Sequence, residues 1–232
     1  MVYKRVLLKL SGEILKGDNS IFDERVLERL SREIASVHSA GVEIAVVIGG
    51  GNIFRQKTHA SKKMDRVTAD YMGMIATIIN GLALQDALER FNLETRLMSA
   101  VEVNAVAEPF IRRRALRHIE KGRIVILAAG TGNPYFTTDS AAVLRSSELK
   151  CDVLIKGTKV DGVYSSDPKK DPEAKLHKSI DYKEVISEKL GVMDSTAFTL
   201  AEENKMPIII FNVLEEGGLL QAVNGLIGTL VS

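Results

Sequence analysis

Short apolar runs alternate along the chain with longer amphipathic segments. The runs are rich in Val and Ile, and most are continuous, which is typical of strands that are buried on both faces. They cover Val6–Leu10, Val42–Ile48, Leu93–Met98, Ile124–Ala128, Val153–Ile155 and Ile208–Phe211. In the segments Arg25–Ser39, Asp65–Phe91 and Pro109–Glu120, apolar residues recur at helical spacing. This alternation of strands and helices predicts an α/β fold with a mostly parallel sheet covered by helices.

Two polar stretches interrupt this rhythm. Thr158–Lys178 carries Asp/Lys-rich turns without apolar periodicity, so we expect an irregular connection there. Gln56–Asp65 is polar and contains lysine, and is predicted to be a mobile loop. Neither stretch is a Gly/Ser-rich or Pro-rich linker of the kind that separates domains. The sequence therefore favours a single domain over 1–232, with one continuous sheet and two functional halves, 1–150 and 151–232.

The composition argues against several classes of protein. The chain has 232 residues, of which 45% are hydrophobic and 26% charged, and 31 basic against 30 acidic residues leave a net charge of +1. This balance does not fit a disordered chain, an acidic tail or a basic nucleic-acid-binding arm. Cys151 has no second cysteine to pair with, and the histidines lack the paired spacings of zinc sites. The first apolar run, Val6–Leu10, is far shorter than the roughly 20 residues that span a bilayer. We expect a cytoplasmic protein without a membrane anchor.

The residues that follow the predicted strands indicate a phosphate site. In an open parallel sheet, ligands bind at the carboxyl ends of the strands. Glycine with polar or basic neighbours stands at such ends in Lys9–Glu13, Gly49–Asn52, Ala129–Pro134 and Lys156–Lys159. Glycine lets the backbone bring its N–H groups close to an anion, and a helix that begins just beyond adds its positive end. The P-loop and dinucleotide-binding signatures are incomplete here, so neither class is supported.

These motifs are more specific together than singly. Over essentially the whole chain they resemble the amino acid kinase family, and within it the bacterial uridylate kinases. The resemblance is carried by Lys9-Leu10-Ser11-Gly12-Glu13, Val47–Asn52 with Phe54-Arg55, Met72-Gly73-Met74, Gly130–Asp139, and Lys159–Tyr164 with Asp167-Pro168. It implies a three-layer α/β/α sandwich with a mostly parallel central sheet, and phosphoryl transfer from ATP to UMP. It also implies Mg²⁺ carried by the ATP phosphates, no metal ligands from the protein, and a homo-oligomer, typically a hexamer.

Lys9, Arg55 and Asp139 are the candidate catalytic residues. Phosphoryl transfer depends mainly on positioning and charge neutralisation, so fixed cations matter more than a strong base. Lys9 ends the first predicted strand, where a cation beside backbone donors can hold the transferring phosphoryl group; a surface lysine is the alternative. Arg55 can fork onto phosphate oxygens or pair with a surface carboxylate. Asp139 is interpreted either as a helix N-cap or as the residue that orients Lys9 or Mg²⁺.

The resemblance assigns the two nucleotides to separate residues, with UMP mainly in 1–150 and ATP mainly in 151–232. ATP is expected at Lys9, Leu10, Ser11, Gly12, Gly51, Arg55, Thr158, Tyr164 and Asp167. UMP is expected at Gly50, Asp70, Thr131, Gly132, Asn133, Pro134, Tyr135, Phe136, Thr137 and Thr138. Asp70 would bind the ribose hydroxyls, or else is a solvated helix charge. Tyr164 would stack on adenine, or else belongs to a short buried hairpin around Val163.

Other features have plainer interpretations. Arg112–Arg114 with Arg117 form a basic stripe, but acidic residues flank it, so a solvated or intersubunit face is favoured and no nucleic-acid partner is expected. The long apolar segment Asp65–Phe91 is a candidate interface between subunits. Asp194 is predicted to be a helix N-cap, and Cys151 a small core residue.

Two other functions stay open at the level of sequence. A kinase of the same fold could phosphorylate carbamate, acetylglutamate or aspartate, but Asp70 and the loop Thr131–Asp139 match recognition of a nucleoside monophosphate instead. A non-catalytic nucleotide sensor is the second alternative. The presence of Lys9, Arg55 and Asp167 argues against it, because a protein that only binds has no need of transfer machinery.

Overall fold

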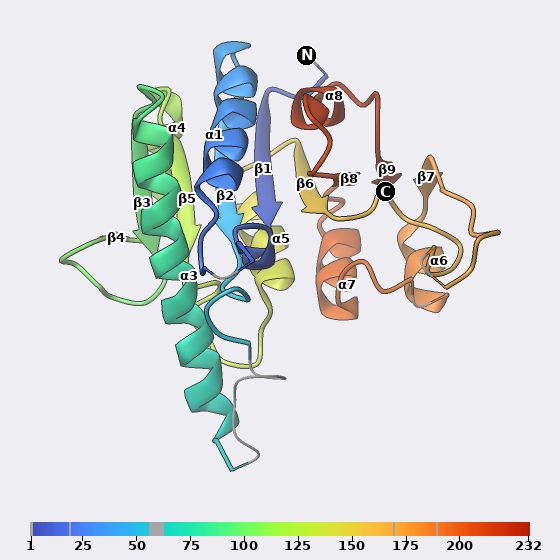
Figure 1. The fold of residues 1–232 in the computed structure, drawn as a ribbon, viewed down its shortest axis with the longest axis horizontal. Helices are drawn as coiled ribbons and strands as arrows, with labels where there is room; N and C mark the ends of the chain where they lie inside the picture. The colour runs from blue at the N-terminus through green and yellow to red at the C-terminus, as the bar shows by residue number, and fades with distance from the viewer. Residues whose placement is uncertain (1, 19, 56–62, 169, 189) are drawn as a thin grey trace.

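The structure, a computed structural model, describes residues 2–18, 20–55, 63–168, 170–188 and 190–232 (Figure 1). Most of the predicted loop Gln56–Asp65 lies outside the described residues. The strands are β1 (Arg5–Leu10), β2 (Glu43–Ile48), β3 (Thr95–Ser99), β4 (Glu108–Pro109), β5 (Ile124–Ala128), β6 (Val153–Thr158), β7 (Ser179–Ile180), β8 (Ile208–Asn212) and β9 (Thr229–Val231). The helices are the 3₁₀ turn η1 (Gly12–Ile14), α1 (Glu24–Ser39), α3 (Arg66–Glu89), α4 (Arg112–Glu120), α5 (Thr138–Glu148), α6 (Tyr182–Ser187), α7 (Ser195–Glu203) and α8 (Gly218–Val223).

The described strands form one sheet in the order β4-β3-β5-β2-β1-β6-β8-β9-β7. From β4 to β8 all neighbours are parallel. β9 is antiparallel to β8, and β7 is parallel to β9. This confirms the predicted mostly parallel sheet.

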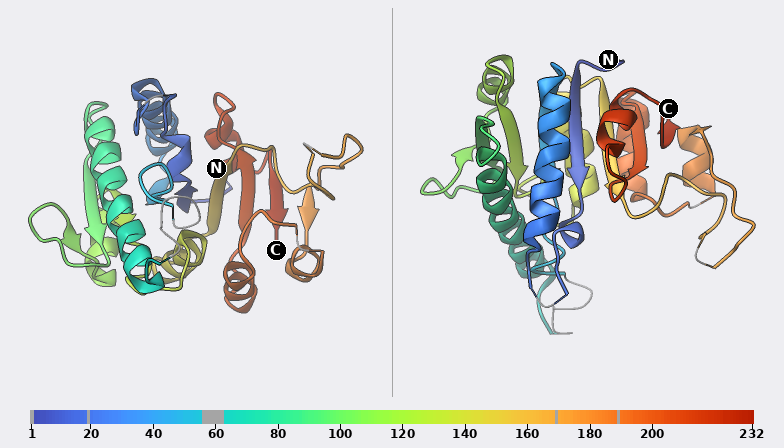
Figure 2. Two further views of the ribbon diagram at one scale, coloured as in Figure 1. Left: turned by 60° about the horizontal axis from the view of Figure 1, so that its bottom comes forward. Right: turned by 45° about the horizontal axis from the view of Figure 1, so that its top comes forward.

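Helices cover both faces of the sheet, because successive strand residues point to opposite sides. Leu8 and Val46 belong to a core shared with α1, α3 and α8. Their neighbours Leu7 and Val47 belong to a second core, shared with α4, α5, α6 and α7. Figure 2 shows the resulting three layers, with the sheet between the two sets of helices.

The predicted element bounds differ most from the structure at two places. The predicted helix Pro109–Glu120 begins only at Arg112, because Glu108 and Pro109 pair as β4 with Met98 and Ser99 of β3. The strand predicted to end at Ile155 continues to Thr158, because β6 stays paired with β1 and β8 beyond that point. Both differences come from long-range pairing, which local periodicity does not report.

Helix α3 combines a buried and an exposed apolar face. By length and composition alone it could cross a membrane, but 44% of its most apolar stretch is buried within the protein. It packs against β3, β5 and α1, as the core helix of a globular domain does. The opposite face leaves Tyr71, Ile75 and Ile79 between 42% and 52% exposed.

Candidate active site

The carboxyl ends of the central parallel strands meet at one edge of the sheet. Leu10, the last residue of β1, is in register with Ile48 of β2 and Gly157 of β6, so the turns that follow lie side by side. The side chain of Leu10 is fully buried, which leaves only its backbone to face a ligand. Gly12 lies against the turn after β2, where a Cβ atom would come within 2.4 Å of the carbonyl oxygen of Gly49. Only glycine fits at this position.

Two lysines and one aspartate form an ion-pair cluster at this edge. Lys9 of β1 and Lys156 of β6 are register partners and are only 6% and 7% exposed. Asp139, in the first turn of α5, pairs with Lys9 through Oδ1 and accepts a 2.7 Å hydrogen bond from Lys156 Nζ through Oδ2. Burial by itself would raise the pKa of Asp139, but the two ammonium groups outweigh it and hold this pKa below its ordinary value. The cluster is therefore two fixed cations joined by one ionised carboxylate.

Lys156 was not assigned a role from the sequence. Burial lowers its pKa to about 8, Lys9 acts in the same direction, and Asp139 opposes both. Its amine also donates to the carbonyl oxygen of Val192. The signal in the sequence is a lysine inside an otherwise apolar buried strand, because such a charge needs a partner.

The interpretation of Asp139 as a helix N-cap is wrong. Thr137 caps α5, and its Oγ1 accepts from the N–H groups of Asp139 and Ser140 at 3.1 Å each. The carboxylate of Asp139 is then available to the two lysines, which fits the alternative interpretation that it orients Lys9. Asp194 is an N-cap as predicted, since Oδ1 accepts from the N–H of Ala197 at 3.0 Å. Its Oδ2 also accepts from Thr137 Oγ1, which joins the start of α7 to the start of α5.

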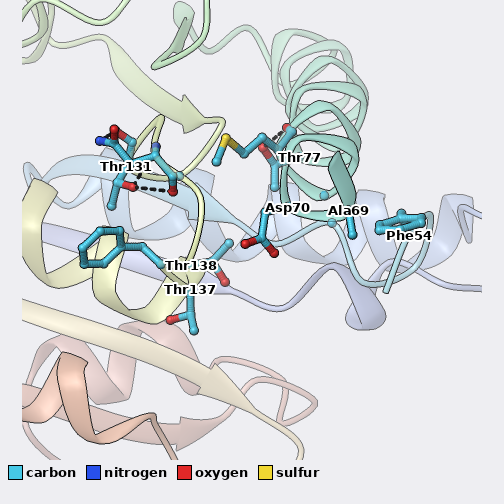
Figure 3. A pocket seen from close by; sticks show the side chains of 13 residues that line it. Phe54, Ala69, Asp70, Thr77, Thr131, Thr137 and Thr138 are labelled. Atoms are coloured by element: carbon cyan, nitrogen blue, oxygen red, sulfur yellow. Dashed lines mark hydrogen bonds between the residues drawn. The ribbon is translucent and has the colours of Figure 1, made fainter. Parts of the chain in front are cut away.

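A cleft of about 600 Å³ opens between the first half of α3 and the loop after β5. Figure 3 shows Phe54 and Asp70 on one side and Thr131, Thr137 and Thr138 on the other. The residues expected to bind UMP that line this cleft are Gly50, Asp70, Thr131, Asn133, Phe136, Thr137 and Thr138. Gly132, Pro134 and Tyr135 are not part of the lining, and the Tyr135 side chain is 65% exposed. The sequence thus predicts most of the wall, but not which side chains of the loop face inward.

Polar side chains of α3 that sequence reasoning missed hold the two turns beside this cleft. Thr77 Oγ1 accepts from the N–H of Ala129, at 2.7 Å. Asn80 Nδ2 donates to the carbonyl oxygen of Gly49 at 2.6 Å, and the amides of Asn80 and Asn52 exchange hydrogen bonds of 2.7 and 3.0 Å. Thr77 and Asn80 are polar residues in an apolar helix and one helical turn apart, a pattern that signals buried backbone contacts.

The turn after β2 contributes a steric constraint and a cation. A Cβ at Gly50 would lie 2.8 Å from both Ala76 Cβ and the carbonyl oxygen of Gly73, whereas one at Gly51 would meet nothing closer than 3.4 Å. Arg55 forms an ion pair with Glu13, and these side chains are 45% and 41% exposed. Glu13 is thus the surface carboxylate partner that the sequence allowed for Arg55 as the alternative to phosphate. A pair so exposed contributes little stability, so an incoming phosphate can compete with Glu13 for the guanidinium.

A second cleft, of about 880 Å³, lies between the connection that follows β6 and the segment that precedes α7. Of the residues expected to bind ATP, Tyr164 and Asp167 line this cleft. The others do not line it, namely Lys9, Leu10, Ser11, Gly12, Gly51, Arg55 and Thr158. The Thr158 hydroxyl instead closes a turn by donating to the carbonyl oxygen of Val160 at 2.7 Å. Tyr164 forms an isolated antiparallel β-bridge with Leu176, next to the fully buried Val163. The backbone here therefore also fits the alternative interpretation, a short buried hairpin.

The ion-pair cluster connects the walls of the two clefts. Thr138, which lines the first cleft, precedes Asp139 in the chain, and Val192, which lines the second, accepts from Lys156. Neither lysine is among the described residues that line the two clefts, but their contacts place them next to one wall residue of each cleft. Buried cations at such a point can offset the repulsion between two phosphates.

A sequence model described as the amino acid kinase family matches residues 4–212. The chain belongs to the amino acid kinase family. Three solved structures are similar to this chain over nearly the full length of both chains. UMP kinase from Bacillus anthracis is 42% identical with a TM-score of 0.95, and covers 99% of this chain and 96% of its own. UMP kinase from Ureaplasma parvum is 38% identical with a TM-score of 0.94, and the coverage is 99% and 98%. Uridylate kinase from Archaeoglobus fulgidus is 26% identical with a TM-score of 0.74, and the coverage is 98% and 99%.

The side chains at this edge would suit a metal ion that is carried by a nucleotide. In the part of the chain that the structure describes, His, Cys, Asp and Glu side chains do not gather in groups of three or more that could hold an ion. Mg²⁺ keeps several waters and is commonly bound through substrate phosphates with few protein carboxylates. Asp139 is engaged by two lysines, so a Mg²⁺ ion at this edge would take its ligands mainly from phosphate oxygens and water.

The remaining candidates lie away from the clefts. Arg114 and Arg117 of the basic stripe lie 3.7 and 3.4 Å from the carboxylates of Glu108 and Glu120. Cys151 is buried, and burial raises the pKa of its thiol to about 12. A thiol that stays protonated at neutral pH is a poor nucleophile, which agrees with the interpretation of Cys151 as a core residue.

Proposed function

We propose that this chain is a UMP kinase, which transfers the γ-phosphoryl group of ATP to UMP and releases UDP and ADP. The observation that carries the proposal is the buried Lys9–Asp139–Lys156 cluster between two clefts, in a chain 42% identical to a UMP kinase of solved structure. The first cleft is lined by residues before 150 and the second by residues after 151, which supports a UMP-binding half and an ATP-binding half. The reaction would serve pyrimidine nucleotide synthesis in the cytoplasm.

The proposed mechanism is direct in-line transfer. An oxygen of the UMP phosphate attacks the γ-phosphorus of ATP while the bond from that phosphorus to the ADP oxygen breaks, so no covalent enzyme intermediate forms. ATP and UMP carry about four and about two negative charges near neutrality, and this repulsion is the main obstacle. Lys9 and Lys156 neutralise the oxygens that gain charge, and Asp139 holds their ammonium groups in place. Mg²⁺, when bound with ATP, adds positive charge on the phosphates that the lysines do not reach.

The shape and chemistry of the first cleft favour a nucleoside monophosphate over a small acid. Phe54 and Phe136 both line it and offer apolar surface to a planar base. Thr131 and Asn133 add hydroxyl and amide groups near the loop, and Asp70 offers a carboxylate to ribose hydroxyls. A carbamate, acetylglutamate or aspartate kinase would leave much of this lining unused.

The exposed face of α3 supports a homo-oligomer, which we expect to be a hexamer. Tyr71, Met72, Ile75 and Ile79 are 39–52% exposed and recur at helical spacing, so they form one apolar stripe. A second copy of the chain that packs its own stripe against this one would bury both in an isologous contact. Sedimentation equilibrium would measure the assembly, and a chain that stays monomeric at micromolar concentration would contradict this part of the proposal.

The test is ADP release from ATP and Mg²⁺ with UMP, CMP, dTMP, carbamate, acetylglutamate and aspartate offered separately. We expect turnover with UMP and background rates with the other acceptors. Turnover with a small acid would overturn the acceptor assignment but keep phosphoryl transfer. Silence with every acceptor, in a protein that still binds ATP, would favour a nucleotide sensor. The control is Lys9→Met, which should retain the fold but lose about 10²- to 10³-fold or more in kcat.

A further inference from the structure

Arg66, the first residue of α3, forms an ion pair with Asp70 whose carboxylate is far less exposed than those of the other described ion pairs with four-residue spacing. Its Nε donates to Asp70 Oδ2 at 2.9 Å, one helical turn further on. In the comparable pair Arg32–Glu28, both side chains are more than half exposed. Here the arginine is 48% exposed and the Asp70 side chain 15%, and Asp70 lines the first cleft. An exposed pair of this spacing contributes little stability, whereas one that orients a partly buried carboxylate can shape a site.

Arg66 and Asp70 also hold the loop on the far side of the cleft. The backbone N–H of Tyr135 donates to Oδ2 of Asp70 at 2.8 Å, and the Arg66 guanidinium lies 5.3 Å from the centroid of the Tyr135 ring. Tyr135 adopts φ of 73°, in the left-handed region that a bulky residue rarely enters. Such a conformation persists only where its surroundings hold it, and here Asp70 and Arg66 do so.

Both hydrogen bonds that the described residues give Asp70 end on the same oxygen, Oδ2. This arrangement fixes the plane of the carboxylate and leaves Oδ1 for a hydroxyl group in the cleft. We propose that Arg66 is a positioning residue, which fixes Asp70 and the Tyr135 turn together and keeps the loop 131–137 in place over the first cleft. The contacts that join Arg66, Asp70 and Tyr135 are called the clasp. The identification of UMP as the ligand rests on the proposed function, whereas the clasp does not.

The test compares wild type, Arg66→Ala and Arg66→Lys with the control Arg32→Ala, which removes an ion pair of the same spacing far from the cleft. We expect Arg66→Ala to raise both the KM and the calorimetric Kd for UMP about three- to tenfold, with kcat and the KM for ATP within about twofold of wild type. Arg66→Lys should recover part of the loss, because an ammonium group keeps the charge but not the planar fork. Arg32→Ala should match wild type.

A second readout does not depend on the reaction. Amide hydrogen exchange at Tyr135 should be faster in Arg66→Ala than in wild type, because the loop is held less firmly. Unchanged UMP affinity together with unchanged exchange would overturn the proposal, and so would a loss confined to kcat, which would mean that Arg66 acts on the transferring phosphate. A wild type that neither binds nor phosphorylates UMP, with exchange altered as expected, would refute the proposed function and leave the clasp standing.

Discussion

Lys9 and Lys156 approach the same carboxylate from adjacent parallel strands, at the same register of the sheet. Two buried ammonium groups so close together repel; Asp139 pairs with both, and Asp194 also raises the pKa of Lys156. The pKa of Lys156 nevertheless stays below its ordinary value, so a phosphate group beside the lysines would further favour their charged form. The cluster is therefore arranged to be more stable with anionic ligands than without them, which is the condition for preorganised electrostatic stabilisation of a phosphoryl group.

The first prediction concerns the alkaline limb of the activity profile. Burial lowers the pKa of Lys156 to about 8, so the side chain loses its positive charge as pH rises through that value. We expect kcat/KM, which reports the pKa values of the free enzyme, to fall above about pH 8, and Lys156→Met to show lower activity without this limb. The measurement is kcat/KM against pH from 6 to about 10 for both proteins. An identical limb in Lys156→Met would assign the titration to another group.

The lowered pKa of Lys156 affects stability in the opposite direction: activity should fall as pH rises, but the contribution of Lys156 to the free energy of unfolding should increase. The unfolded chain holds the Lys156 proton up to the ordinary pKa of 10.5, whereas the folded chain releases it near 8. Between these values the unfolded state binds more protons, so this residue makes the free energy of unfolding increase with pH. Wild type minus Lys156→Met, measured by urea unfolding across this window, should show that positive slope.

The second prediction concerns Asp139→Asn. The substitution keeps the size of the side chain but leaves two buried ammonium groups without their counter-ion, so the free energy of unfolding should fall by about 3 kcal/mol. Because Asp139 raises the pKa of Lys156, its loss should also move the alkaline limb of kcat/KM to lower pH. Asp86→Asn is the control, since it removes an exposed partner of Arg90 on α3 and should leave both properties unchanged. A limb that stays in place would show that Asp139 does not act through Lys156.

Much of this site can be predicted from the sequence, because a glycine that follows a short apolar run can be recognised from its immediate neighbours. The positions of Gly12, Gly50 and Gly51 can be read from the apolar runs that precede them. The cap of α5 was harder, because Thr137, Thr138 and Asp139 are all acceptable capping residues and local rules do not choose among them. The contacts in the structure show which residue is the cap. Thr137 accepts hydrogen bonds from the first-turn N–H groups, and the Asp139 carboxylate pairs with the lysines instead.

Pairs that are far apart in sequence were beyond such reasoning. The register of β6 against β1 places Lys156 beside Lys9, and α5 brings Asp139 to both lysines. Thr137 reaches Asp194 across 57 residues. The exposed ring of Tyr135 was missed for a different reason. Its left-handed backbone turns the side chain out of the cleft, and nothing in its residue type predicts that conformation.

The third prediction compares two adjacent glycines. Gly50→Ala would bring a methyl group within 2.8 Å of Ala76 Cβ and of a backbone oxygen of α3, so the turn after β2 must shift. We expect a loss of about 1–3 kcal/mol in the free energy of unfolding and weaker UMP binding. Gly51→Ala is the matched control, because its Cβ would make only ordinary contacts and the position does not have positive φ. Thermal denaturation and UMP titration of both variants make the test, and equal effects would contradict the steric argument.

The fourth prediction separates the two clefts by substrate. Asp70 lines the first cleft and Tyr164 the second, and no lining residue is shared between the two among the described residues. We expect Asp70→Asn to raise the KM for UMP about tenfold with the KM for ATP little changed, because a neutral amide is a weaker acceptor for ribose hydroxyls than a carboxylate. Tyr164→Ala should do the reverse, because loss of a stacking ring weakens adenine binding by about 1–3 kcal/mol. Initial rates with each substrate varied in turn give both constants. If either variant weakened both substrates equally, its residue would belong to the structure shared by the clefts rather than to one nucleotide, and the division of the chain into two binding halves would fail at that residue.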